Sequence, residues 1–141
     1  MKGPCRRPRR READGGFNRF VEGEYQRWLA GKGPVLSHQV VERFVRPHWA
    51  GPNTYLIVLD SMRADQWDAI VPLLADYFDV SSDYYCSILP TATPYSRNAI
   101  FSGLLPLEIQ RRYPKYWVTE DSGQNRYEPE LLDEQLPARG A

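Results

Sequence analysis

The stretch from Tyr85 to Gly103 constrains the fold more than any other part of the chain. Residues 84–89 are rich in aromatic and β-branched side chains, which predicts a strand running into a turn. Thr93 fits the N-cap of a following helix, Pro94 fits its first position and Gly103 fits its C-terminal stop. The Thr93 hydroxyl should therefore lie at a helix N-terminus, where free N–H groups favour negative charge. There it can cap the helix, or it can attack phosphorus.

A second stretch predicts the rest of the fold class. Residues 54–59 are an unbroken apolar run that ends at Asp60, which is typical of a strand buried on both faces of a parallel sheet. A helical pattern follows from Ala64, so the two strands should be parallel and joined by a right-handed crossover. Their carboxyl ends then open on one edge of the sheet, within reach of one metal ion bound by Asp60 and Thr93. This order predicts an α/β fold.

Two blocks of the sequence resemble a known family. Residues 60–65 (DSMRAD) and 89–106 (LPTATPYSRNAIFSGLLP), with residues 34–38 (PVLSH) upstream, look like the start of a PglZ domain of the alkaline phosphatase superfamily. The similarity is greatest to the effector domain of PorX-type response regulators, which control type IX secretion, and it extends to about Trp117. The resemblance implies part of an alkaline-phosphatase-like parallel sheet with flanking helices, preceded by a short helical segment.

The resemblance also implies an activity and a set of site residues. The parent activity is zinc-dependent hydrolysis of a phosphodiester or nucleotide substrate. The first Asp of the family pattern binds metal and a Ser or Thr at the helix start is both nucleophile and ligand, and these roles fall on Asp60 and Thr93. Thr91 is the alternative hydroxyl, because it lies only two residues earlier.

Other charged residues are candidates with two interpretations each. Arg63 and Arg97 could contact phosphate, or each could pair with a carboxylate inside the fold. Asp65 could orient a metal ligand from outside the site. His38 and His48 match no zinc spacing, and a structural role is expected for both.

The sequence divides into four segments. Residues 1–16 are Arg-rich and are expected to be a disordered basic tail, which is either a nucleic-acid-binding arm or the product of a displaced start codon or shifted frame. Residues 17–50 predict a helical lead-in segment, with a first helix stopped at Gly31 and a second capped by Ser37 and ending before Pro47. Residues 51–118 predict the N-terminal part of the PglZ domain. Residues 119–141 predict an acidic, poorly ordered tail.

Composition excludes several classes of protein. Lys plus Arg equals Asp plus Glu at 18 each, so net charge indicates neither a specific nucleic-acid site nor a membrane surface. No apolar run approaches the ~20 residues needed to cross a membrane. The two cysteines support neither a disulfide framework nor a thiolate metal site, so a cytoplasmic location is expected.

The ligands of a complete two-zinc site are not evident. No histidine follows His48, the late carboxylates follow no strand, and no receiver domain precedes the motifs. We therefore expect a truncated PglZ-domain chain that does not retain zinc by itself. Two classes of function remain: a fragment of a phosphodiesterase, or a non-catalytic fragment that binds a signalling protein.

Overall fold

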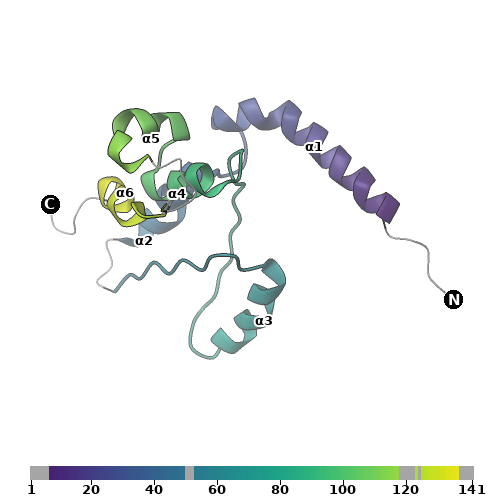
Figure 1. The fold of residues 1–141 in the computed structure, drawn as a ribbon. Helices are drawn as coiled ribbons and strands as arrows, with labels where there is room; N and C mark the ends of the chain where they lie inside the picture. The colour runs from purple at the N-terminus through teal and green to yellow at the C-terminus, as the bar shows by residue number, and fades with distance from the viewer. Residues whose placement is uncertain (1–6, 50–52, 118–122, 124, 137–141) are drawn as a thin grey trace.

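The computed structural model describes residues 7–49, 53–117, 123 and 125–136. Within these ranges the chain folds into one long N-terminal helix and a series of shorter helices joined by loops (Figure 1). The elements, in chain order, are α1 (Arg7–Leu29), the 3₁₀-helix η1 (Ser37–Gln39), the π-helix η2 (Val41–Val45), α2 (Arg46–Trp49), α3 (Ala64–Leu74), the π-helix η3 (Thr93–Arg97), α4 (Asn98–Ser102), α5 (Pro106–Arg112), the 3₁₀-helix η4 (Pro114–Tyr116) and α6 (Glu128–Gln135).

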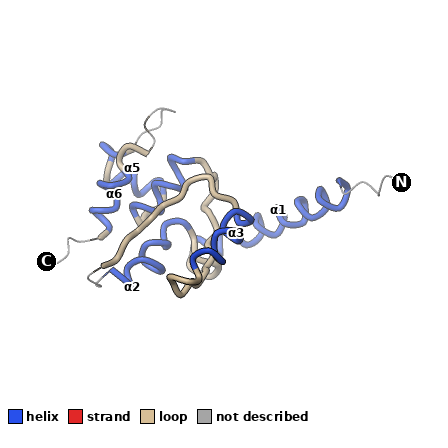
Figure 2. Tube along the Cα trace, turned by 90° about the horizontal axis from the view of Figure 1, so that it is seen from below, coloured by secondary structure: helices blue, strands red, loops and turns tan. Residues whose placement is uncertain are grey.

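The expected parallel sheet is absent from the described residues, so the α/β prediction is wrong for this structure (Figure 2). Residues 54–59 and 84–89 are extended but do not pair with each other. The described residues contain one isolated parallel bridge, between Leu36 and Cys86.

Hydrogen bonds join the second extended segment to residues near the N-terminus. The backbone N–H of Cys86 donates to the carbonyl of Val35 at 2.8 Å, and that of Ile88 donates to Ser37 Oγ at 3.1 Å. The N–H of Leu89 donates to the hydroxyl of Tyr25 at 2.7 Å. These donors are therefore committed to residues near the N-terminus, and a strand forms only where a neighbour takes its backbone groups.

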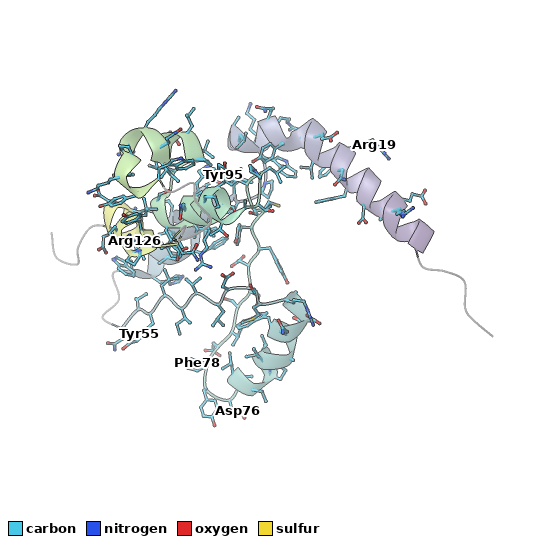
Figure 3. All side chains as sticks on the ribbon, in the orientation of Figure 1. Arg19, Tyr55, Asp76, Phe78, Tyr95 and Arg126 are labelled. Atoms are coloured by element: carbon cyan, nitrogen blue, oxygen red, sulfur yellow. The ribbon has the colours of Figure 1, made fainter. Side chains whose placement is uncertain are left out.

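The apolar run 54–59 is exposed, contrary to the prediction of a buried strand. Tyr55 is 84% exposed and Ile57 77%. The run crosses from the helical cluster toward α3, which stands apart from the other helices (Figure 1). In Figure 3 the side chains of Tyr55 and Phe78 project from this part of the molecule. The helices bury apolar surface against one another and leave this run uncovered.

Two small clusters hold most of the buried apolar side chains among the described residues. The first is formed by Leu36, Ile88 and Ala99, and Trp28 and Leu29 from the end of α1 pack against it. The second joins α4, α5 and α6 through Phe101, Ile109 and Leu131. Because α4 contributes to both clusters, it holds the two halves of the core together.

Helix α1 ends where the sequence predicted but begins earlier than predicted. It ends at Leu29, and Gly31 follows with a positive φ of 77°. The N–H groups of Gly31 and Lys32 donate to the carbonyls of Trp28 and Arg27, which is a Schellman arrangement. The helix begins at Arg7, so residues 7–16 are helical and not disordered as expected; residues 1–6 lie outside the described part of the chain.

Two further segments differ from their predictions. Ser37 does not cap a helix; Leu36 precedes η1, and α2 continues through Pro47 to Trp49. Residues 128–135 form α6 and bury Leu131 completely, so this part of the predicted acidic tail is folded. Among the described helices, none combines the length and the apolar character needed to cross a membrane.

We predict that Ser37→Ala destabilises the fold. The Ser37 side chain is fully buried and its Oγ is the acceptor for the Ile88 N–H. Its loss leaves that donor buried without a partner, which costs about 1–3 kcal/mol. Urea unfolding measures the change, and Ser81→Ala, at an exposed position, is the matched control. Equal midpoints for the two variants would contradict this account of the segment 86–89.

Candidate functional site

Three of the predicted site residues line one cavity. It has a volume of about 320 Å³ and lies between the end of the run 54–60, the segment 85–87 and the turn that leads into η3 and α4. Its lining residues are Val58, Leu59, Asp60, Tyr85, Ser87, Thr91, Thr93, Ser96, Arg97, Ile100 and Phe101. Asp60, Thr93 and Arg97 are therefore brought together without the predicted sheet, and the alternative hydroxyl of Thr91 lines the same space.

The helix start at Thr93 differs by one residue from the prediction. Ala92 is the N-cap residue, Thr93 is the first residue of η3 and Pro94 follows within its first turn. The Ser96 hydroxyl donates to the carbonyls of Thr91 and Ala92 at 3.0 and 3.2 Å, which fixes the turn before the helix. The helix ends as expected at Gly103, which has a φ of 68°. Thr93 is partly buried, whereas Thr91 is exposed.

Arg97 connects three segments of the site. Its Nη1 lies 2.6 Å from Asp60 Oδ2, and its Nη2 donates to Glu128 Oε2 at 3.0 Å. Its Nε donates to Glu128 Oε1 as well, so the contact with α6 is bidentate. The side chains of Arg97 and Glu128 are 22% and 12% exposed, and that of Asp60 is 69% exposed. Arg97 thus pairs with carboxylates, which is one of the two roles that the sequence suggested for it.

Glu128 was missed by the sequence analysis. Its hydrogen bonds are the main cause that raises the pKa of the Arg97 guanidinium above its ordinary value, and Asp60 adds a smaller effect in the same direction. With two carboxylates and one guanidinium, the cluster carries one excess negative charge. The helix that carries Glu128 could have been predicted from Pro129, which fits a first helical turn, and from the apolar residues that follow it at helical spacing.

The backbone at Asp60 is unusual. Ser61 is not glycine but has a φ of 60°, a left-handed conformation that costs about 1–2 kcal/mol in a non-glycine residue. Its N–H donates to Asp60 Oδ1 at 2.8 Å, so both oxygens of the carboxylate have partners. Strained residues of this kind occur often at functional sites.

Arg63 and Asp65 do not line this cavity. Arg63 donates two hydrogen bonds of 2.8 Å to the Asp65 carboxylate at the start of α3, and both side chains are about 70% exposed. This pair raises the pKa of Arg63 and lowers that of Asp65. The pairing matches the carboxylate interpretation of Arg63, and among the described residues no hydrogen bond joins Asp65 to Asp60 or Thr93.

The described residues do not make a complete zinc site. They contain no group of three or more His, Cys, Asp or Glu side chains close enough to hold a metal ion. His38 and His48 lie outside the cavity. Asp60 and Thr93 supply at most two of the donors that zinc needs, and one Asp60 oxygen is bound to Arg97.

Comparison with known families identifies the class of domain. The sequence model of the PglZ family, described as the BREX system PglZ alkaline phosphatase-like domain, matches residues 40–139. The chain therefore belongs to the PglZ family. The match includes Asp60, Thr93, Arg97 and Glu128, and it places the chain in a phosphoesterase-type superfamily. No curated protein matches the sequence significantly.

We predict that Arg97→Gln destabilises the fold by about 2–4 kcal/mol. The substitution leaves the largely buried Glu128 carboxylate without its cation, and a broken buried pair is far more costly than a broken surface pair. Arg63→Gln, which breaks an exposed pair, is the control and should not change stability measurably. Chemical denaturation of both variants tests this, and similar small losses would mean that the Arg97–Glu128 pair is dispensable.

Proposed function

We propose that this chain carries part of the active site of a metal-dependent phosphodiester hydrolase, with Thr93 as the nucleophile. The observation that carries the proposal is that Asp60 and Thr93 line one cavity within the residues matched by the PglZ family. The substrate class is a phosphodiester or nucleotide. In the proposed reaction the Thr93 oxygen loses its proton to solvent and bonds to phosphorus, while the P–O bond to the leaving alcohol breaks and that alcohol takes up a proton. Water then cleaves the Thr93–phosphate ester and restores the hydroxyl.

The roles within the site follow from the partners of each side chain. Thr93 is preferred to Thr91 because it lies at the helix start and is partly buried beside Arg97. Asp60 is the proposed metal ligand, with Thr93 as a second donor, and zinc is the proposed metal. The described side chains do not complete that site, so we derive no step through the metal.

The finer identity is also a proposal. The blocks 60–65 and 89–106 resemble the effector domain of PorX-type response regulators, which supports a cytoplasmic, PorX-like role in the regulation of type IX secretion. The chemistry can be tested without a secretion assay. The nucleophile can be substituted in a complete PglZ domain that carries these motifs.

We predict that Thr93→Ala in such a complete domain lowers phosphodiester hydrolysis by a factor on the order of 10³ or more, because no nearby group replaces a lost nucleophile. Thr91→Ala is the matched control and should retain most of the activity. Hydrolysis of bis(p-nitrophenyl) phosphate, with zinc present, measures both. Loss with Thr91→Ala and retention with Thr93→Ala would move the nucleophile two residues upstream.

The exposed apolar run supports a second candidate function, that of a non-catalytic fragment that binds a signalling protein. Tyr55, Ile57 and Leu59 are each at least 60% exposed, and extended apolar segments with free backbone groups bind other chains readily. Such a fragment would act through this surface and would not need a complete metal site.

We predict that the wild-type chain elutes early or broadly in size-exclusion chromatography, because the exposed run promotes association. Ile57→Lys should restore a sharp monomeric peak without changing the circular dichroism spectrum, since the replaced side chain has little packing to lose. Ser81→Lys, at another exposed position, is the control. A sharp monomeric wild-type peak would count against this second candidate.

A further inference from the structure

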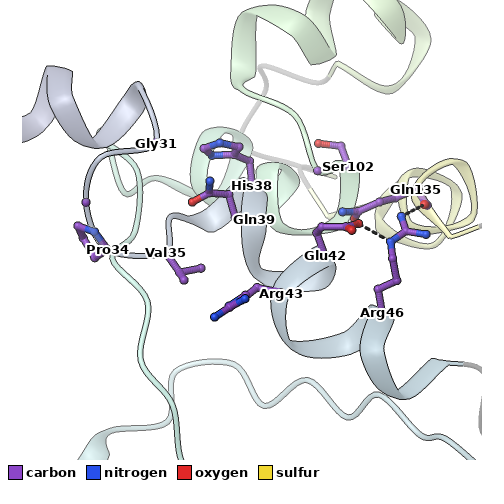
Figure 4. Close-up of a pocket in the computed structure, with 12 residues that line it drawn as sticks. Gly31, Pro34, Val35, His38, Gln39, Glu42, Arg43, Arg46, Ser102 and Gln135 are labelled. Atoms are coloured by element: carbon purple, nitrogen blue, oxygen red, sulfur yellow. Dashed lines mark hydrogen bonds and ion pairs between the residues drawn. The ribbon is translucent and has the colours of Figure 1, made fainter.

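A second cavity, larger than the one that contains Asp60 and Thr93, lies elsewhere in the fold. It has a volume of about 740 Å³ and is formed by the turn after α1, the run from η1 to α2, the end of α4 and the end of α6 (Figure 4). The two cavities share no lining residue: Ile100 and Phe101 line the first, and the next residues, Ser102 and Gly103, line the second. Its volume falls within the range of ~300–1,000 Å³ typical of small-molecule sites.

The charges that line this second cavity do not balance. Arg46 is satisfied, because it pairs with Glu42 and donates to the carbonyl of Gln135 at 3.1 Å. Arg43 has no hydrogen-bond or ion-pair partner within the described ranges, and in Figure 4 its side chain points away from the Glu42–Arg46 pair. If His38 is neutral, the cavity carries one excess positive charge.

Burial favours the neutral form of the His38 imidazole. It lowers the pKa of the imidazole, and the opposing effect of Glu108 is smaller. The Nδ1 atom of His38 is buried and has no hydrogen-bond partner among the described atoms. The Nε2 atom is not both buried and unpartnered. Because a buried unpaired N–H is rarer in proteins than a buried unpaired acceptor, the proton belongs on Nε2. His38 therefore offers one accessible N–H donor in this cavity.

We propose that this second cavity binds a small organic anion whose carboxylate or phosphate is held by the Arg43 guanidinium and His38 Nε2–H. A guanidinium presents paired N–H donors that match either oxyanion. Pro34 and Val35 supply an apolar wall for the body of the ligand. This site is independent of the proposed hydrolytic function, because it uses none of its residues.

Imidazole NMR on the 141-residue chain tests the proposal with acetate and inorganic phosphate as separate probes at constant ionic strength. The chain has two histidines, so His48, which lies outside this cavity, is an internal reference. The His38 signals should shift and saturate with acetate if the ligand is a carboxylate, or with phosphate if it is a phosphate. Saturation with neither probe, or a parallel shift of His48, would overturn the proposal.

Two arginine variants make the test specific. Arg43→Gln should weaken binding of the saturating probe at least tenfold, and because Arg43 is exposed the substitution removes no buried contact. Arg111→Gln, at an exposed position on α5, should leave the affinity unchanged. Arg43→Lys, which keeps the charge but not the planar fork, should give an intermediate affinity. Equal affinities for Arg43→Gln and the wild type would overturn the assignment.

Discussion

A guanidinium that is only 22% exposed must be neutralised where it lies, and the arrangement of this domain depends on how Arg97 meets that requirement. Glu128 reaches it from α6 and Asp60 from the end of the extended run. Helix α6 is in turn fixed to α4 through the buried Leu131. One side chain therefore connects three segments that are far apart in sequence, and it holds the proposed metal ligand Asp60 at the cavity that also contains Thr93.

The second constraint is the backbone of residues 86–89. Its N–H groups are committed to Val35, Ser37 and Tyr25, so the segment is anchored to the N-terminal helices and not to residues 54–59. A parallel pair also needs a covering layer on each face, and the described helices pack on one another instead. Within the described part of the chain, residues 55–59 are thus extended and exposed and form no strand pair with residues 84–89.

The correct predictions concerned local backbone structure or rested on the two blocks of residues that resemble the PglZ family. The stops at Gly31 and Gly103 follow from the left-handed conformation that glycine adopts easily, and both were predicted. The family was predicted from two blocks of residues. Asp60 and Thr93 line one cavity, but the parallel strands from which their proximity was predicted are absent from the described residues. The strands were predicted wrongly, because pairing is decided by distant partners that an apolar run does not specify. Glu128 and Ser37 were missed as contacts for the same reason: each acts on a residue more than 30 positions away.

The two carboxylates of Arg97 are not equivalent, and this difference bears on the site. Glu128 is largely buried and already gives the guanidinium two hydrogen bonds, so Arg97 can release Asp60 without becoming an unpaired buried charge. Glu128 cannot be released in the same way, because it would remain buried and negative. Asp60 is 69% exposed and loses little when water replaces Arg97. Of the three charged groups, the proposed metal ligand is therefore the one that is free to change partner.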